Sequence, residues 1–187
     1  MMKCQKFLNV RTYVRHRDEP GALFLWGWLS KPVPVALPTF DLPCAFASVD
    51  YEHTHESGLL RGEVNAGGRQ FSYRATINSQ SSFEHCSPNS LAEFTMERYS
   101  GFFYRGNRAK IFRAWHPAWL QTTVNATINE DRLLTAKFSW FNEAKFVGAN
   151  FAPGFKQVSL GRVHSLKNVV GQSRKRSHGT NTFYEMP

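Results

Sequence analysis

Two groups of residues in this sequence carry side chains that could bind a ligand or take part in its chemistry. The first group could transfer a proton or attack an electrophile, and it consists of Glu97, His116 and Cys44. The second could hold a polar or anionic molecule, and it consists of Asn9, Arg11, Tyr13, Arg98, Tyr99 and Trp119. An arginine binds a carboxylate through two parallel N–H donors, and a histidine can act as general acid or base because its pKa lies near neutrality. Together these residues predict a pocket for a small organic or anionic ligand.

Three of the ligand-binding candidates lie within residues 9–14, which predict a β-strand. Side chains alternate between the two faces of a strand, so Asn9, Arg11 and Tyr13 would share one face and the residues between them the other. A polar turn and the apolar residues 22–26 then predict a hairpin. The polar face of its first strand is therefore expected to line a cavity.

The same residues also have structural interpretations. Arg11 would form a buried ion pair with Glu97 if both faced the interior. His116 would be a turn histidine bonded to the backbone beside Pro117. Cys44 would be a small buried hydrophobe rather than a thiolate, because free cysteine usually packs in this way.

Two further patterns leave alternatives open. Glu97, Arg98 and Tyr99 follow a predicted helix, so they could form a charge network at its end instead of facing a cavity. His53 and His55 are spaced so that both could chelate a metal from one strand face, but no third ligand is evident nearby. We expect an exposed strand face there, with no metal site and no cofactor.

Many short strands separated by turns predict an all-β fold with one or two short helices. A hairpin is expected from residues 9–15 and 22–29, an irregular crossover from the proline-rich residues 31–43, and a meander from residues 45–54, 59–65 and 69–77. Ser90 and Glu93 fit a capping box that would start a helix over residues 91–98. A second hairpin is expected at residues 102–104 and 109–115, and further strands at residues 121–129, 146–151 and 156–164.

Composition limits the class of protein. We expect one domain over residues 1–170 and a disordered polar tail over residues 171–187, which holds part of the net charge of +9. The remaining basic residues are spread along strands, so nucleic acid is not an expected partner. No apolar run approaches the ~20 residues of a membrane span, no signal peptide is visible, and the three cysteines form no pair motif. A cytoplasmic location is expected, and a homo-oligomer is left open.

Three segments, in order, resemble one bacterial family. They are residues 9–14 (NVRTYV), residues 89–99 (NSLAEFTMERY) and residues 108–119, which end in HPAW. They are similar to domain of unknown function 2071, the YqjF-like proteins, which are grouped with the acetoacetate decarboxylase-like β-barrels. The resemblance implies an antiparallel β-barrel, which is expected to be incomplete in this chain. It covers roughly residues 7–166, and the family's block of strands before the first segment is missing, so the chain resembles an N-terminally truncated member or a gene start placed too late.

The resemblance also implies what this chain lacks. Acetoacetate decarboxylase forms a Schiff base on one of two adjacent lysines, whose pKa is lowered by the second cation and an apolar pocket. These lysines fall on Cys44 and Ala45, and an acidic position of the family falls on Phe7. The leading hypothesis is therefore a small-ligand-binding barrel without imine chemistry. The alternatives are an enzyme that uses Glu97 and His116 for proton transfer, and a basic barrel that binds single-stranded nucleic acid.

Overall fold

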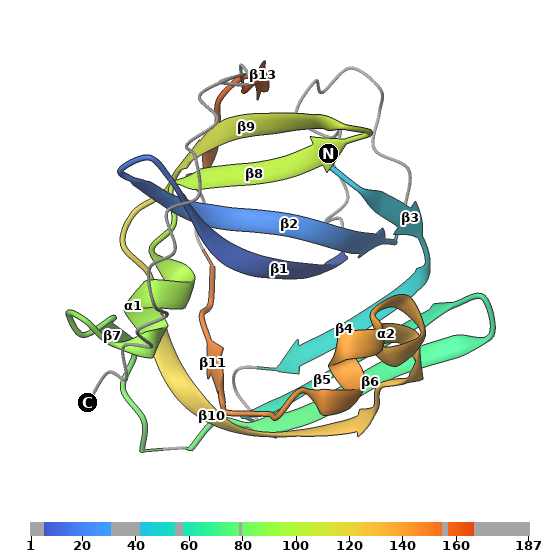
Figure 1. Cartoon of the computed structure of the whole chain (residues 1–187). Helices are drawn as coiled ribbons and strands as arrows, with labels where there is room; N and C mark the ends of the chain where they lie inside the picture. Colours follow the sequence, from blue (N-terminus) through green and yellow to red (C-terminus); the bar gives the residue numbers. More distant parts are fainter. Residues whose placement is uncertain (1–5, 31–41, 55–57, 79, 155–156, 167–187) are drawn as a thin grey trace, which may run out of the picture.

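The computed structural model describes residues 6–30, 42–54, 58–78, 80–154 and 157–166 (Figure 1). Its strands are β1 (Phe7–His16), β2 (Glu19–Leu29), β3 (Cys44–Phe46), β4 (Ser48–Thr54), β5 (Leu59–Ala66), β6 (Arg69–Thr76), β7 (Glu84–His85), β8 (Ser100–Arg105), β9 (Arg108–Trp115), β10 (Leu120–Glu130), β11 (Ala149–Phe151), β12 (Ser159–Leu160) and β13 (His164–Ser165). The helices are α1 (Leu91–Met96), α2 (Arg132–Lys137) and the 3-10 turn η1 (Ser139–Glu143). The tail, His55 and most of the proline-rich crossover lie outside the described residues.

The strands form two sheets that face each other (Figure 1). The seven-stranded sheet has the order β1-β2-β8-β9-β12, with β3 on β2 and β13 on β9, and the six-stranded sheet has the order β11-β10-β6-β5-β4, with β7 on β10. The predicted all-β class is confirmed. The described strands do not close into a barrel, which agrees with the expectation of an incomplete one. Two pairings depart from the expected antiparallel pattern, because β2 pairs in parallel with both β3 and β8.

The sheets stay open where the edge strands β1 and β4 face each other. No ladder of backbone hydrogen bonds joins these two strands in the described part of the chain. A side chain spans the gap instead, since Lys6 Nζ donates to Asp50 Oδ1 at 2.6 Å and to the Tyr51 carbonyl at 3.3 Å. An exposed ion pair of this kind contributes far less to stability than a ladder of backbone hydrogen bonds would.

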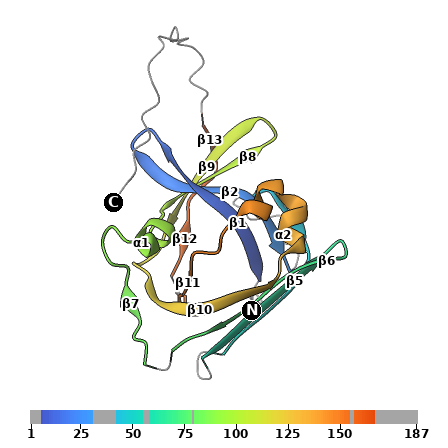
Figure 2. The ribbon, with the colours of Figure 1, turned by 60° about the horizontal axis from the view of Figure 1, so that its bottom comes forward.

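The chain crosses from one sheet to the other on both sides of the space between the sheets. The prediction of one strand over residues 45–54 is wrong, because β3 pairs with β2 of one sheet whereas β4 pairs with β5 of the other. Likewise, β11 pairs with β10 and β12 pairs with β9, so these two consecutive strands belong to the six-stranded and the seven-stranded sheet, respectively. Figures 1 and 2 show this second crossing on the same side as α1.

The first hairpin is confirmed, with a bulge at its centre. Val10 is paired with Trp26 and Arg11 with Phe24, so Leu25 is an extra residue on β2. A bulge bends and twists the strand but leaves the alternation of β1 intact. Arg11 and Tyr13 share a face as predicted, since Arg11 Nε donates to the Tyr13 hydroxyl at 3.2 Å.

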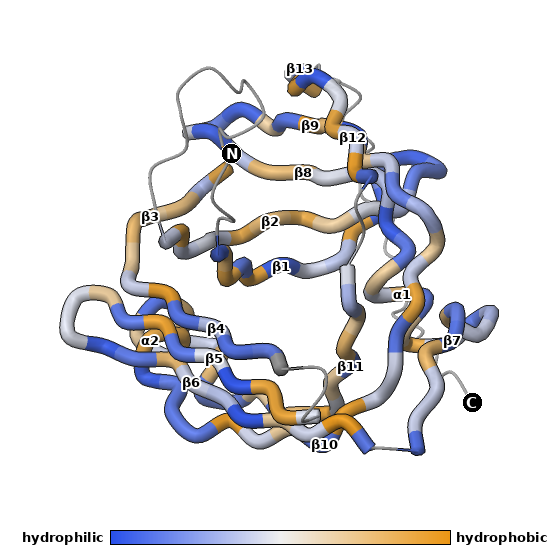
Figure 3. Tube along the Cα trace, turned by 180° about the vertical axis from the view of Figure 1, so that it is seen from behind, coloured by the Kyte–Doolittle hydropathy of each residue, from blue (hydrophilic) through white to orange (hydrophobic). Residues whose placement is uncertain are grey.

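The larger apolar cluster packs α2 against the six-stranded sheet. Its buried members are Trp28, Val49, Val64, Phe71, Leu133 and Leu134. Figure 3 shows apolar stretches of α2 next to β4, β5 and β6. The sequence analysis gave no position for this second helix, although the adjacent leucines after Asp131 supply its buried face. No helix in the described part of the chain is long and apolar enough to cross a bilayer.

Aromatic rings cover glycines on neighbouring strands in both sheets. The pairs are Gly21 with Phe102, Gly27 with Phe7, Gly62 with Tyr73 and Gly101 with Phe112. A Cβ atom on any of these glycines would collide with the ring that covers it. Glycine is thus required at these positions by close approach rather than by a special backbone angle.

We predict that Gly101→Ala destabilises the protein by about 1–3 kcal/mol, the usual cost of overpacking a filled core. The ring that must move belongs to Phe112, which is only 6% exposed. Urea unfolding measures the change in the free energy of unfolding. Gly161→Ala is the matched control, because its Cβ would meet only ordinary contacts from 3.4 Å and should cost less than about 0.5 kcal/mol. Equal effects of the two variants would contradict the prediction.

Candidate ligand-binding cleft

A cleft of about 1350 Å³ lies between the two sheets, next to α1. Its apolar walls include Phe7, Phe24, Met96, Phe112 and Trp119, and its polar lining consists of Asn9, Arg11, Ser90, Thr95, Arg98, Ser100, His116, Thr123 and Asn150. Among the described residues that line it, there is no aspartate, glutamate or lysine. The lining is therefore largely apolar, with arginine as its only fixed charge.

Arg11 reaches the cleft from the polar face of β1 and is held against the end of α1. Its Nη2 donates to the carbonyl of Thr95 at 3.0 Å, and the Tyr13 hydroxyl donates to the same carbonyl at 3.0 Å. A cation suits this position because the last carbonyls of a helix carry partial negative charge. The predicted buried ion pair of Arg11 with Glu97 is wrong, since Arg11 is exposed and the Glu97 carboxylate is bonded elsewhere.

Arg98 lines the cleft because α1 ends before it. The predicted cap is confirmed, with Ser90 Oγ accepting from the Glu93 amide at 3.1 Å, although the Glu93 carboxylate accepts from Asn89 rather than from Ser90. The helix ends at Met96, two residues earlier than predicted, because Glu97 leaves the helical region with φ −88° and ψ 68°.

The two arginines that line the cleft flank one ring. The guanidinium carbon of Arg11 lies 5.7 Å from the centre of the Tyr13 ring, and that of Arg98 lies 6.0 Å from it. Arg98 also lies 4.6 Å from the Phe94 ring and donates to the Glu97 carbonyl at 2.8 Å. Neither arginine has a carboxylate partner in the described part of the chain, so two cations converge without a neutralising anion.

Glu97 and His116 lie in one network, but only His116 lines the cleft. The Glu97 carboxylate accepts from the Trp119 amide at 2.7 Å and from the Tyr99 hydroxyl at 2.6 Å. The hydrogen bond from the Tyr99 hydroxyl to Glu97, together with partial burial, raises the pKa of Tyr99 to about 12. The Tyr99 ring stacks on His116 with centroids 4.6 Å apart. His116 is 8% exposed, and its Nδ1 lies 2.8 Å from the Pro117 carbonyl, as expected for a turn histidine.

Of the remaining predicted residues, some line the cleft and others lie outside its lining. Asn9 and Trp119 line it, whereas Tyr13 and Tyr99 support residues that do. Cys44 lies on β3, half-buried and outside the lining, and burial raises the pKa of its thiol. This is the opposite of what a thiolate nucleophile requires, so the buried-hydrophobe interpretation of Cys44 fits the structure better.

One wall of the cleft was missed by the sequence analysis. It is formed by residues 147–150, Ala152, Val158 and Leu160, along the crossing between the sheets. These small and apolar residues carry no chemical signature. Only the pairing of β11 and β12 with different sheets brings them to the cleft.

A second missed feature fixes the strands that form the floor of the cleft. Glu19 on β2 accepts from the Ser100 hydroxyl on β8 and pairs with both terminal nitrogens of Arg113 on β9, with 2.9 Å between Arg113 Nη2 and Glu19 Oε2. Ser100 is 3% exposed and lines the cleft. The Ser100 hydrogen bond, together with Arg113, holds the pKa of Glu19 below its usual range.

We predict that the Glu19 carboxylate stabilises the fold at neutral pH and that this contribution is lost in acid. A lowered folded-state pKa gives stability that is complete above the unfolded-state pKa, near 4.3, and that declines as the pH falls through the folded-state value. Urea unfolding at pH 7 should show Glu19→Gln to be less stable than the unmodified protein. Below about pH 4 the difference should shrink. Glu84→Gln, which changes an exposed glutamate, is the control, and a gap that is constant with pH would contradict the assignment.

Most of the chain matches a known protein family. Residues 3–151 match the family domain of unknown function 2071, whose description is "uncharacterized conserved protein". The chain belongs to this family. The predicted membership is thereby confirmed, and the match includes Asn9, Arg11, Arg98 and Trp119 of the cleft.

Solved structures support the predicted fold. The enduracididine biosynthesis enzyme MppR, in complex with the condensation product of pyruvate and imidazole 4-carboxaldehyde, is 12% identical, with a TM-score of 0.50 over 86% of this chain and 62% of MppR. MppR in complex with pyruvate is 13% identical, with a TM-score of 0.47 and the same coverage. MppR has an acetoacetate decarboxylase-like fold, and at this identity the likeness concerns the fold alone. A search among curated proteins gave no match.

Proposed function

We propose that this protein binds an amphipathic organic anion, a carboxylate with an apolar body, in the cleft between its sheets. The observation that carries the proposal is that Arg11 and Arg98 line the cleft without a carboxylate partner among the described residues. Two like charges that flank one tyrosine ring repel each other. A bound anion would relieve this repulsion and accept hydrogen bonds from the unused N–H groups.

The size and walls of the cleft favour a ligand larger than a short keto acid. Sites for small molecules usually have volumes of roughly 300–1,000 Å³, and this cleft has about 1350 Å³. Phe7, Phe24 and Phe112 supply apolar surface on the side of the seven-stranded sheet. A ligand would place its carboxylate at the arginines and its apolar body against these rings.

Imine chemistry has no support in the described residues. The positions of the family's lysine pair hold Cys44 and Ala45, on β3. Lys6 is bonded to Asp50, Lys110 to Ser165, and Lys137 lies over the Trp26 ring. Lys145, the remaining described lysine, is exposed and does not line the cleft. The described chain thus places no amine in the cleft, and the proposed function is binding rather than Schiff-base catalysis.

Octanoate is a direct probe of the proposed site. Isothermal titration calorimetry should show binding to the unmodified protein, and Arg98→Met and Arg11→Met should each weaken it by about ten- to a hundredfold, the range for a hydrogen bond to a charged group. Octanol, with the same chain but no charge, should bind more weakly than octanoate. Arg15→Met is the matched control, because Arg15 is exposed on the same strand and does not line the cleft. Equal affinities for octanol and octanoate would refute an anion site.

A second experiment tests the absence of imine chemistry. Borohydride reduction in the presence of acetoacetate should leave the intact mass unchanged, because a reducible imine needs a neutral amine at the bound ketone. Acetoacetate decarboxylase, treated identically, is the positive control. A stable adduct on any lysine would show that the chain retains a Schiff-base residue.

The alternative of an enzyme that uses Glu97 and His116 has one supporting observation, the buried position of His116 in the cleft lining. Glu97 does not line the cleft, and two donors occupy its carboxylate. Proton transfer would therefore fall to His116, with Glu97 acting on it only through the ring of Tyr99. The cytoplasmic location stays a prediction. Binding of single-stranded nucleic acid stays the alternative that was not favoured, and a homo-oligomeric state stays open.

A further inference from the structure

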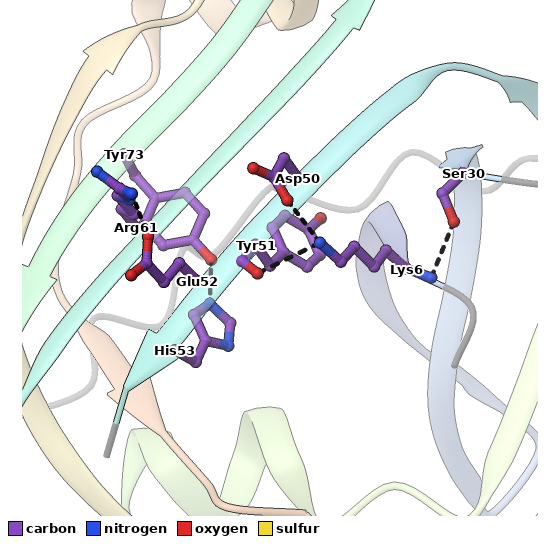
Figure 4. Close-up of polar contacts among 8 residues, drawn as sticks. All are labelled: Lys6, Ser30, Asp50, Tyr51, Glu52, His53, Arg61 and Tyr73. Atoms are coloured by element: carbon purple, nitrogen blue, oxygen red, sulfur yellow. Dashed lines mark hydrogen bonds and ion pairs between the residues drawn. The ribbon is translucent and has the colours of Figure 1, made fainter. Parts of the chain in front are cut away.

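A second polar group lies on the inner face of the six-stranded sheet, outside the cleft lining. His53 is on β4 and Tyr73 is on β6, and β5 runs between these strands (Figure 4). Gly62 of β5 pairs with Tyr51 on one side and with Tyr73 on the other. A side chain at Gly62 would collide with the Tyr73 ring. Because none is present, the ring lies across β5 and its hydroxyl reaches His53.

The contacts of His53 fix its ring but leave one nitrogen available. Its Nε2 lies 2.8 Å from the Tyr73 hydroxyl oxygen. The ring stacks on Tyr51, with centroids 5.5 Å apart and planes inclined by 8°, and Phe151 meets it edge-on at 5.9 Å. Nδ1 has no hydrogen-bond partner in the described part of the chain, and His53 remains exposed. Nδ1 is therefore the nitrogen of His53 that could bond a further group.

The surroundings favour the uncharged form of both members of the pair. Burial, with a smaller effect of Lys6, lowers the pKa of His53, and burial raises the pKa of Tyr73. Lys6 is itself fixed by Asp50 and by the Tyr51 carbonyl (Figure 4). A tyrosine hydroxyl can donate or accept, so it is compatible with either tautomer of the imidazole. In the tautomer with the proton on Nε2, this nitrogen donates to the Tyr73 hydroxyl and Nδ1 is left as an acceptor.

We propose that His53 and Tyr73 form a second binding site, which takes the hydroxyl group of an uncharged aromatic molecule. Nδ1 of His53 would bond the hydroxyl, and the aromatic ring would lie beside Phe151, which packs against the apolar cluster of Leu60, Ala75 and Val124. Anions are not favoured here, because Arg61 pairs with Glu52 and lies on the opposite face of β5 from Gly62. The site is independent of the proposed anion site at Arg11 and Arg98.

The test uses the full chain with phenol and anisole, which share a ring but differ in that the methylated oxygen cannot donate. Nitrogen-15 correlation spectra of the imidazole rings follow His53 among the seven histidines, and His53→Gln assigns its signals. Phenol should shift the Nδ1 signal of His53 in a saturable manner, and anisole should bind at least about fivefold more weakly, the effect of one lost hydrogen bond. Unshifted His53 signals, or equal affinities for the two probes, would overturn the proposal.

A variant separates hydrogen bonding from packing. Tyr73→Phe keeps the ring over Gly62 and removes only the hydroxyl that orients His53. It should weaken phenol binding by about fivefold and leave the weaker binding of anisole unchanged, whereas a structural role alone would alter both probes equally. Tyr104→Phe, at an exposed position on β8, is the matched control. Arg98→Met should not affect the phenol-induced shifts, and unchanged phenol affinity in Tyr73→Phe would overturn the assignment of Tyr73.

Discussion

The close fit of aromatic rings over strand glycines is the constraint on which the other features of this structure depend. Phe7 lies over Gly27 and Phe112 over Gly101, and both rings form walls of the cleft. Tyr73 lies over Gly62 and thereby reaches His53. In each case a ring occupies the place of a missing side chain on the adjacent strand, so two positions on different strands act as one structural unit. The shape of the cleft and the position of the second polar pair are thus set by backbone positions that carry no chemistry themselves.

Charge in the cleft follows from how α1 ends. The helix supplies the Thr95 carbonyl that holds Arg11, and its early termination at Met96 turns Arg98 toward the same ring. Glu97, between them, is drawn away by the Trp119 amide and the Tyr99 hydroxyl. The end of this short helix therefore directs the Glu97 carboxylate away from two cations, the adjacent Arg98 and the distant Arg11 of β1, which is why the cleft lining holds arginine without a countercharge in the described chain.

Much of the fold followed from local patterns, since alternation and turn residues placed both hairpins, the strands of the meander and the capped helix close to their observed bounds. The shared face of Arg11 and Tyr13 was predictable for the same reason. The hydrogen-bond partner of the Arg11 side chain was not predictable, because the burial of β1 depends on which strands lie opposite it. Contacts between strands that are distant in sequence decide the split of residues 44–54 between two sheets, the cleft wall along β11 and β12, and the role of Gly62. No local pattern encodes these contacts.

The gap between β1 and β4 has a consequence for how the interior is filled. Thr123, Ala149 and Asn150 of the six-stranded sheet and Phe24 and Phe112 of the seven-stranded sheet line the same cleft, so a molecule seated there touches both sheets. The apolar part of such a molecule would fill space between the sheets that the side chains of the protein leave open. Occupancy would then be linked to folding: the bound form resists unfolding by an amount that grows with the logarithm of ligand concentration. The cleft is, in this sense, an unfilled part of the hydrophobic core, and a ligand bound there would be a non-covalent component of the folded protein.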